Sequence, residues 1–436
     1  MDRFLMKKLV TWKINRNRKP LILNGARQVG KTWLLKEFGR QYFTNAAYIN
    51  LDNNPRMMSQ FDLDFNTERL LLAFEVETGE QIVPGKTLII LDEIQECPKA
   101  LTSLKYFSEN APEQMIVAAG SLLGITIHAG SGYPVGKVDS MDLYPLNFRE
   151  FLEATGNTNL RKLIDGKDSK QIEVAESFST KLIPLLKQYY FVGGMPEVVK
   201  IFLDTNNFGE VRRTQQNILQ GYERDISKHM TASEIEYTLA AWNSIPAHLA
   251  QENKKFIFGH IKKGARAREY RSAITWLSQA GLATRVTRIS GPGIPLSGYA
   301  QDNVFKLFLL DVGLLGAMVG LDPSSMLDSR TIFTGFKGAL TEQYVCQQLI
   351  SDGGFTPFYW SADNSRGEID FIVQKGSDIF PIEVAAEENL RSKSLRAFTD
   401  KYTGMHPLRF SLSPFKDRAW MRNIPLYECT NVNLWK

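Results

Sequence analysis

The stretch Gly25-Ala26-Arg27-Gln28-Val29-Gly30-Lys31-Thr32 decides the fold of the N-terminal part of this chain of 436 residues. Its two glycines have the separation of a P-loop and are followed by Lys and Thr. The apolar run Leu21-Ile22-Leu23 before the loop predicts a buried strand, and residues 32–40 after it predict a helix. Because a chance glycine-rich turn would not bring this strand and helix with it, the stretch predicts a binding site for a nucleoside triphosphate, ATP with Mg²⁺.

The residue types of this loop match what a triphosphate requires. We expect the glycines to let backbone N–H groups wrap a phosphate beside the positive end of the helix dipole. Lys31 is expected to reach the β- and γ-phosphate oxygens, and Thr32 to offer its hydroxyl to Mg²⁺. The predicted nucleotide-binding residues of the loop are Gly25, Ala26, Arg27, Gln28, Val29, Gly30, Lys31 and Thr32.

Outward from the loop, further short apolar runs alternate with amphipathic helical segments. The runs at 47–51, 87–91 and 115–119 read as buried strands, and 98–110 reads as a helix. Continuous apolar strands are typical of a parallel sheet that helices cover on both faces. The sequence therefore predicts a doubly wound α/β domain.

Two acids follow the strand at 87–91. Asp92 is expected to hold Mg²⁺, and Glu93 to orient and deprotonate the attacking water. Ser121, at the end of the next strand, is expected to sense the γ-phosphate. Taken alone, acids or a serine at a strand end can simply mark where a strand meets solvent. Beside a P-loop they predict hydrolysis, with Lys31, Asp92, Glu93 and Ser121 as the catalytic set.

The rest of the chain is organised differently. Residues 156–230 are mostly helical, and residues 231–320 give helices followed by strands at 283–289 and 304–310 around a Gly/Pro-rich turn. Helices followed by a β-hairpin are the pattern of a winged helix. Residues 321–436 predict a helix at 338–351 and a last α/β domain.

Several motifs resemble prokaryotic AAA-type (AAA+) ATPases of a family with a C-terminal domain of unknown function and restriction-endonuclease-like core. Besides the P-loop and Asp92-Glu93, these motifs are 119–121, 133–138, 144–151, 193–197, 222–226 and 305–315. The resemblance covers nearly the whole chain. It implies an AAA+ core at 1–155, a helical lid at 156–230, a winged helix at 231–320 and a restriction-endonuclease-like α/β domain at 321–436.

Two further sets of residues follow from this resemblance. Arg149 and Arg224 are candidates for an arginine that senses the γ-phosphate, in cis or from a neighbouring subunit. The alternative for each is an arginine on a solvated helix face, paired to a nearby acid. Met195 and Pro196 are candidates for packing near the adenine, although a helix-breaking turn explains the same residues without a ligand.

A basic stretch at 254–271 falls in the predicted winged helix. Its candidates for contacting DNA phosphates are Lys262, Lys263, Arg266 and Arg268. Winged helices also dock proteins, and charged residues commonly just solvate a helix. The net charge of +5 on the whole chain permits nucleic acid as a partner without requiring it.

The C-terminal acids Glu342, Asp370 and Glu383 fall in the order of a metal-dependent nuclease site. The lysine expected two residues after Glu383 is Ala385, which favours a degenerate site used for docking a protein partner. The leading hypothesis is therefore an ATP-hydrolysing switch that acts on DNA or a DNA-associated protein. A homo-oligomer is compatible with this hypothesis. The alternatives are an ATP-gated nuclease of defence or repair and an ATP-binding scaffold or signalling protein.

Composition bounds the location. The charged N-terminus does not predict a signal peptide, and no run approaches the ~18 apolar residues of a membrane span. Cys97, Cys346 and Cys429 are far apart and form no CxxC pair. This favours the reducing cytoplasm.

Overall fold

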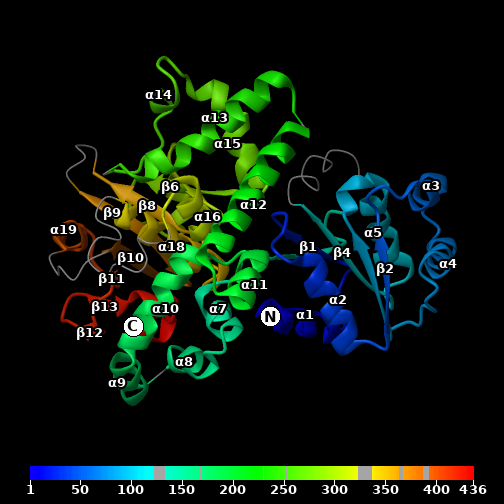
Figure 1. The fold of residues 1–436 in the computed structure, drawn as a ribbon, viewed down its shortest axis with the longest axis horizontal. Helices are drawn as coiled ribbons and strands as arrows, with labels where there is room; N and C mark the ends of the chain where they lie inside the picture. The colour runs from blue at the N-terminus through cyan, green and yellow to red at the C-terminus, as the bar shows by residue number, and fades with distance from the viewer. Residues whose placement is uncertain are drawn as a thin grey trace. The chain divides into compact units, whose positions relative to one another are not determined.

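The structure is a computed structural model (Figure 1). It describes residues 1–121, 133–166, 168–228, 230–251, 253–322, 336–362, 367–385 and 392–436. These residues pack as two compact units. The first unit comprises Asp2–Tyr144 with Gln279–Leu282, and the second comprises Met1, Pro145–Ser278 and Ala283–Lys436.

The first unit is built on a five-stranded sheet with the order β2-β3-β4-β1-β5, in which every pair is parallel. The strands are β1 (Leu21–Gly25), β2 (Asn45–Asn50), β3 (Thr87–Asp92), β4 (Met115–Ser121) and β5 (Asp139–Asp142). Its helices are α1 (Leu5–Ile14), α2 (Lys31–Tyr42), α3 (Pro55–Leu63), α4 (Thr67–Thr78) and α5 (Pro98–Asn110), with the 3-10 turn η1 (Ile94–Glu96). The expected doubly wound α/β fold is confirmed.

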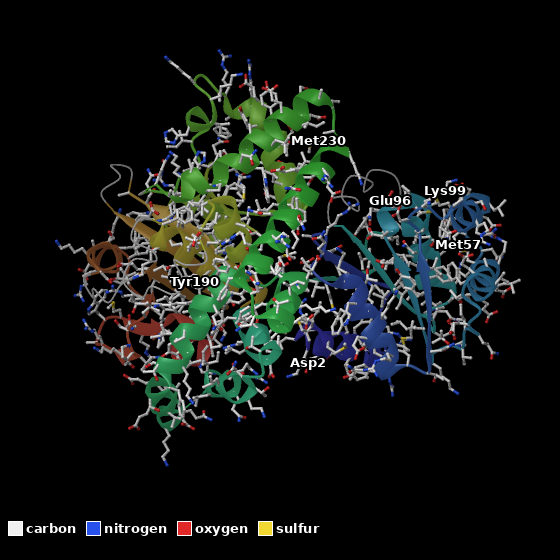
Figure 2. All side chains as sticks on the ribbon, viewed as in Figure 1. Asp2, Met57, Glu96, Lys99, Tyr190 and Met230 are labelled. Carbon is white, nitrogen blue, oxygen red and sulfur yellow. The ribbon has the colours of Figure 1, made fainter. Side chains whose placement is uncertain are left out.

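Burial on both faces explains the apolar strands of this sheet. Ile89 and Leu91 of β3 pack in a core with side chains from α3, α4 and α5, including Met57, which Figure 2 labels. Leu88 and Ile90 alternate with them and therefore point to the opposite face, where they are also fully buried. Only strands covered on both sides can carry such a run.

The second unit is a set of helices around an eight-stranded mixed sheet with the order β12-β13-β11-β10-β9-β8-β6-β7. The strands are β6 (Ala283–Ile289), β7 (Ala300–Leu309), β8 (Phe358–Ser361), β9 (Glu368–Lys375), β10 (Asp378–Val384), β11 (Leu408–Ser411), β12 (Lys416–Asp417) and β13 (Arg422–Pro425). The helices are α7 (Phe148–Ala154), α8 (Thr158–Leu163), α9 (Ser169–Ser177), α10 (Ser179–Val192), α11 (Pro196–Thr205), α12 (Phe208–Lys228), α13 (Ala232–Leu249), α14 (Phe258–Ile261), α15 (Ala267–Gln279), α16 (Val312–Met318), α18 (Lys337–Ser351) and α19 (Lys393–Lys401). Short 3-10 turns complete it at η3 (Leu296–Tyr299), η4 (Leu426–Glu428) and η5 (Val432–Leu434).

One strand pairing bears on the predicted domain boundaries. The strands β6 and β7 form the antiparallel hairpin expected at the end of 231–320, and β6 also pairs in parallel with β8 of the segment 321–436. The hairpin and the C-terminal strands are therefore parts of one sheet (Figure 1). The division of this unit into a lid, a winged helix and a C-terminal domain stays a prediction.

Three of the sequence motifs meet inside the second unit. The backbone N–H of Leu146 donates to the carbonyl of Gly194 at 2.7 Å, and the N–H of Gly194 donates to the Asp311 carboxylate at 2.7 Å. Asp311 also caps α16 by accepting from the N–H groups of Gly313 and Leu314. A Cβ on Gly194 would lie 2.0 Å from the Leu146 carbonyl oxygen, so only glycine fits there.

Within the described residues, no helix is long and apolar enough to cross a bilayer.

Candidate functional site

The P-loop joins β1 to α2 in the first unit. The strand β1 ends at Gly25, and α2 begins at Lys31. Positive φ angles at Gln28 (65°) and Gly30 (95°) bend the loop between them. Such left-handed turns in a short loop aim successive N–H groups into one concavity, which is how backbone binds an anion. A Cβ on Gly25 would lie 2.4 Å from the carbonyl oxygen of Leu143, which explains glycine at the strand end.

Lys31 lies inside this loop. Its ammonium donates hydrogen bonds to the carbonyl oxygens of Gly25 (2.9 Å) and Ala26 (2.8 Å), and its side chain is buried. Burial lowers the pKa of Lys31 to about 8, against the opposing effect of the Glu93 and Asp92 charges. The ammonium is therefore a buried cation whose present partners are neutral carbonyls.

Asp92 is the buried last residue of β3, and its carboxylate is held on both oxygens. The hydroxyls of Thr32 and Tyr48 both donate to Oδ2, at 2.7 Å and 3.0 Å. The backbone N–H of Glu93 donates to Oδ1 at 3.0 Å. The first residue after the P-loop lysine and the acid at the end of β3 are thus brought into contact.

Glu93 and Ser121 lie at the same edge of the sheet. Glu93 has a left-handed backbone (φ 53°), and its carboxylate accepts a hydrogen bond from the Gln95 amide. The strand β4 lies between β1 and β3, and the backbone of Ser121 is in register with Gly25. The Ser121 side chain lies outside the described residues. Ligands of open α/β sheets bind at this carboxyl edge.

The residues present fit Mg²⁺ and a triphosphate. The Thr32 hydroxyl and the Asp92 carboxylate are oxygen ligands of the type that Mg²⁺ prefers, and they already touch. The buried ammonium of Lys31 and the N-terminus of α2 supply positive charge for phosphates.

Two residues of this site were not among those predicted. Tyr48, on β2, donates to Asp92 across 44 positions of sequence. Arg3 is buried and donates from Nη1 to the carbonyl oxygen of Val29 at 3.0 Å, which ties the N-terminus to the P-loop. Neither belongs to a motif, so no sequence signal marks them.

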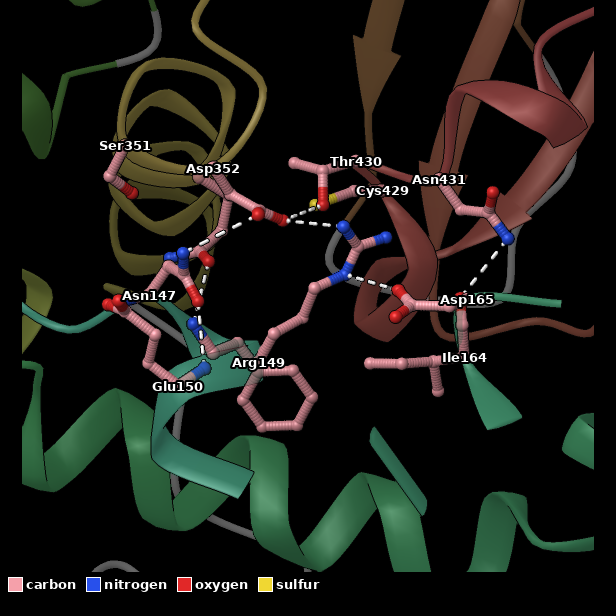
Figure 3. A network of polar contacts seen from close by, with 12 residues as sticks. Asn147, Arg149, Glu150, Ile164, Asp165, Ser351, Asp352, Cys429, Thr430 and Asn431 are labelled. Carbon is pink, nitrogen blue, oxygen red and sulfur yellow. Dashed lines mark hydrogen bonds and ion pairs between the residues drawn. The ribbon is translucent and has the colours of Figure 1, made fainter. Parts of the chain in front are cut away.

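Arg149 is part of a polar network in the second unit, shown in Figure 3. Its guanidinium pairs with Asp165 (Nε to Oδ1, 3.1 Å) and with Asp352 (Nη1 to Oδ2, 3.1 Å). Thr430 donates to the same Asp352 carboxylate, and the Asn431 amide donates to the carbonyl of Ile164 at 3.1 Å. These contacts join the segment after the first unit to the C-terminal tail. The phosphate-sensing role of Arg149 stays a prediction.

The other candidates from the resemblance lie in helices of the second unit. Arg224 is exposed on α12, and none of the ion pairs between described residues includes it. Met195 is fully buried before α11, and Pro196 is the first residue of that helix. Their contact with adenine also stays a prediction.

The four candidates for DNA contact lie in the connection between α14 and α15 and in the first turn of α15. Lys262, Lys263, Arg266 and Arg268 all have exposed side chains. Lys254 of the same basic stretch differs, because its ammonium pairs with Glu342 at 2.6 Å and its side chain is only 13% exposed. The stretch is therefore not one basic surface.

The C-terminal acids separate into two environments. Glu342 lies with Lys254, with Lys306 (Nζ to Oε2, 3.7 Å) and with the charges of Glu368 and Asp370. Lys306 is fully buried and also pairs with Glu368. Burial, and then the charge of Glu342, raise the pKa of Asp370.

Glu383 has other partners. Burial raises the pKa of its carboxyl, and a hydrogen bond from Ser392 and the charge of Arg409 oppose this effect. Across the described ranges, no group of three or more His, Cys, Asp or Glu side chains could hold a metal ion. The nuclease-like arrangement of Glu342, Asp370 and Glu383 stays a prediction.

Comparisons with known proteins divide the chain into three matched parts. Residues 17–152 match the family model of an AAA domain. Residues 183–325 and 337–424 match two domains of unknown function, DUF8612 and DUF4143. The AAA match contains the P-loop, Tyr48, Asp92 and Glu93.

Two matching solved structures are distant from this chain in sequence. A Walker-type ATPase of Pyrococcus abyssi has 14% identity and a TM-score of 0.45, over 73% of this chain and 95% of that one. Cdc6p from Pyrobaculum aerophilum has 10% identity and a TM-score of 0.26, over 72% of this chain and 92% of that one. No match to a curated protein was found.

Proposed function

We propose that this chain, an AAA-type P-loop ATPase, hydrolyses ATP with Mg²⁺ at the loop 25–32 and uses the reaction to change its own conformation. The observation that carries the proposal is the contact between Thr32 and the buried carboxylate of Asp92, with Glu93 as the next residue. A site that only bound nucleotide would not need a second acid at this edge.

Each residue has a task in the proposed reaction. Lys31 exchanges its two carbonyl partners for phosphate oxygens, which is favourable because an ammonium bonds an anion more strongly than a neutral carbonyl. Thr32 and Asp92 would hold Mg²⁺, which supplies charge neutralisation at the phosphates. Glu93 orients the attacking water and takes its proton. The N–H groups of the loop hold the phosphates in place.

The test is ATP hydrolysis measured as phosphate release. We expect Lys31→Ala to lose both binding and turnover. Glu93→Gln should bind ATP but turn over at least about a hundredfold more slowly, because a positioned base contributes this much. Lys8→Ala, an exposed lysine of α1, is the matched control and should behave as the parent. A Glu93→Gln protein as active as the parent would refute the assigned mechanism.

We further propose that the target is DNA or a DNA-associated protein, reached through the exposed basic residues between α14 and α15 and in the first turn of α15. Four cations, Lys262, Lys263, Arg266 and Arg268, are exposed within a span of seven residues. The solvent face of α15 continues them with Arg271, Ser272 and Thr275, which are also exposed, while Tyr270 and Ile274 face the core. Cations and hydroxyls on one helix face can contact phosphates and base edges.

Binding to a short DNA duplex tests this proposal. We expect binding without strong sequence preference that weakens steeply between low and high salt. Replacing the four cations by Gln should weaken binding and reduce the salt slope by about one unit for each lost phosphate contact. The control replaces four exposed lysines elsewhere in the second unit, Lys375, Lys393, Lys401 and Lys416. Equal affinities of the two quadruple variants would exclude this surface.

The contacts of the C-terminal acids speak against a nuclease reaction. Glu342 is engaged by the ammonium groups of Lys254 and Lys306, and Glu383 faces Ser392 and Arg409. These contacts favour a degenerate nuclease site over an active one, and docking of a protein partner by the C-terminal strands stays a prediction.

A further inference from the structure

Tyr48 reaches the nucleotide site from a strand that carries no motif. It lies on β2, where it is in parallel register with Ile90 of β3, while Asn50 is in register with Asp92. In the strand register, Tyr48 therefore lies two residues before the position that faces Asp92. Its side chain is long enough for the hydroxyl to reach Oδ2 of Asp92, at 3.0 Å. No shorter side chain on this strand position would make that contact.

The hydroxyl of Tyr48 is the second hydrogen-bond donor to Oδ2 of Asp92. A carboxylate oxygen has two in-plane lone pairs, and Oδ2 receives the hydroxyls of Thr32 and Tyr48. Oδ1 receives the N–H of Glu93. With three donors from three separate positions, the carboxylate is held in one rotamer, and its remaining acceptor capacity is on Oδ1.

The ring of Tyr48 is itself held by α2. The ammonium of Lys36 lies 3.7 Å from the ring centroid, a cation–π contact. Lys36 follows Thr32 by four residues, so the two side chains project from the same side of α2. These contacts join α2, β3 and β2: Thr32 of α2 contacts Asp92, Asp92 contacts Tyr48, and Tyr48 contacts Lys36 of the same α2.

We propose that Tyr48 is a positioning residue of the Mg²⁺–nucleotide site. Its hydroxyl keeps the Asp92 carboxylate in the orientation that accepts the metal, and Lys36 keeps the Tyr48 ring in place. The inference rests on the proposed function, since it assigns Asp92 to the metal. It assigns no proton transfer to the phenol.

The test separates nucleotide affinity from metal affinity without measuring turnover. Binding of a fluorescent ADP analogue is followed for parent and Tyr48→Phe, first in EDTA and then across a Mg²⁺ titration. Tyr48→Phe keeps the ring and removes only the hydroxyl. We expect unchanged affinity in EDTA and a Mg²⁺ midpoint raised about tenfold, the scale on which loss of an outer-shell partner acts. Lys36→Met should shift the midpoint in the same direction by a smaller factor.

Tyr42→Phe is the matched control, because Tyr42 is exposed at the end of α2 and should leave both measurements unchanged. A Mg²⁺ midpoint for Tyr48→Phe equal to that of the parent overturns the proposal. So does an equal loss of affinity in EDTA and in Mg²⁺, which would mean that the hydroxyl only stabilises the fold. If the parent itself gains no ADP affinity from Mg²⁺, the proposed function fails first, and the inference fails with it.

Discussion

The ion cluster around Lys306 makes a quantitative prediction about stability. Lys306 is fully buried on β7, and its ammonium lies with the carboxylates of Glu342 and Glu368. Replacing it by Met keeps the length of the side chain and removes the charge. The carboxyl groups of buried Glu342 and of half-buried Glu368 and Asp370 would then share the nearby cation of Lys254.

The size of the effect follows from the distances. At 3.7 Å between Lys306 Nζ and Glu342 Oε2, one ion pair contributes about 4 kcal/mol in a medium of effective dielectric constant 20. The pair with Glu368 adds to this, and protonation of an abandoned carboxylate recovers part of it. Loss of one partner of a buried pair costs about 3 to 5 kcal/mol in proteins. We expect Lys306→Met to lower the free energy of unfolding of the second unit by that amount.

Urea unfolding followed by tryptophan fluorescence measures this change. Lys375→Met is the control, since Lys375 is exposed at the end of β9 and should change the unfolding free energy by less than about 0.5 kcal/mol. Adding Glu368→Gln to Lys306→Met should restore part of the lost stability, because it removes an unpaired carboxylate. A Lys306→Met protein as stable as the Lys375→Met control would refute the claim that the ion pairs of Lys306 stabilise the second unit.

The remaining predictions concern Gly194, Asp370 and Lys31. Gly194→Ala should destabilise the second unit strongly, because its Cβ would lie 2.0 Å from the backbone oxygen of Leu146; a thermal midpoint equal to the parent's would contradict this. The pKa of the Asp370 carboxyl is raised in the folded protein above its usual 3.8, so the folded state holds this proton more tightly than the unfolded state. The free energy of unfolding therefore falls as the pH rises from about 4. Asp370→Asn should remove that loss, measurable as a flatter unfolding free energy between pH 4 and pH 7. Burial lowers the pKa of Lys31 to about 8, so ATP should bind about tenfold more weakly at pH 9 than at pH 7 as the ammonium is lost; equal affinities at the two pH values would show that Lys31 stays charged.

Local sequence patterns predicted the elements of the first unit well. The strand expected at 87–91 is β3 (Thr87–Asp92), and the helix expected at 98–110 is α5. These segments are determined by neighbours in sequence, because continuous apolar runs and a Pro at the first helical position act over a few residues. The contact of Thr32 with Asp92 was predictable for a different reason, since both belong to motifs whose relation in space follows from the parallel sheet.

Strand pairing in the second unit could not be predicted in this way. The sequence pattern at 283–289 predicts a strand, which is β6. This pattern does not indicate that β6 pairs in parallel with β8, which follows α18 in the chain. The same holds for charge. Lys254 stands in the basic stretch 254–271, yet its partner Glu342 is 88 positions away. A pattern of charges shows that a residue is ionisable, and only the fold shows which opposite charge meets it.

Tyr48 shows why motifs alone do not predict every residue of the proposed nucleotide site. Motifs report residues that contact the ligand, because ligand chemistry restricts those residue types. A residue that contacts Asp92 instead is restricted only by the register of β2 against β3 and by the reach of its side chain. Thr32, Asp92 and Glu93 are predicted from the sequence because their types and spacing are tied to phosphate and metal. Tyr48 is a half-buried aromatic of a strand, and nothing in its sequence neighbourhood distinguishes it from other strand aromatics. The hydroxyl at 3.0 Å from Oδ2 is what distinguishes it, so the tenfold shift in Mg²⁺ midpoint expected for Tyr48→Phe measures a contribution that the motif does not contain.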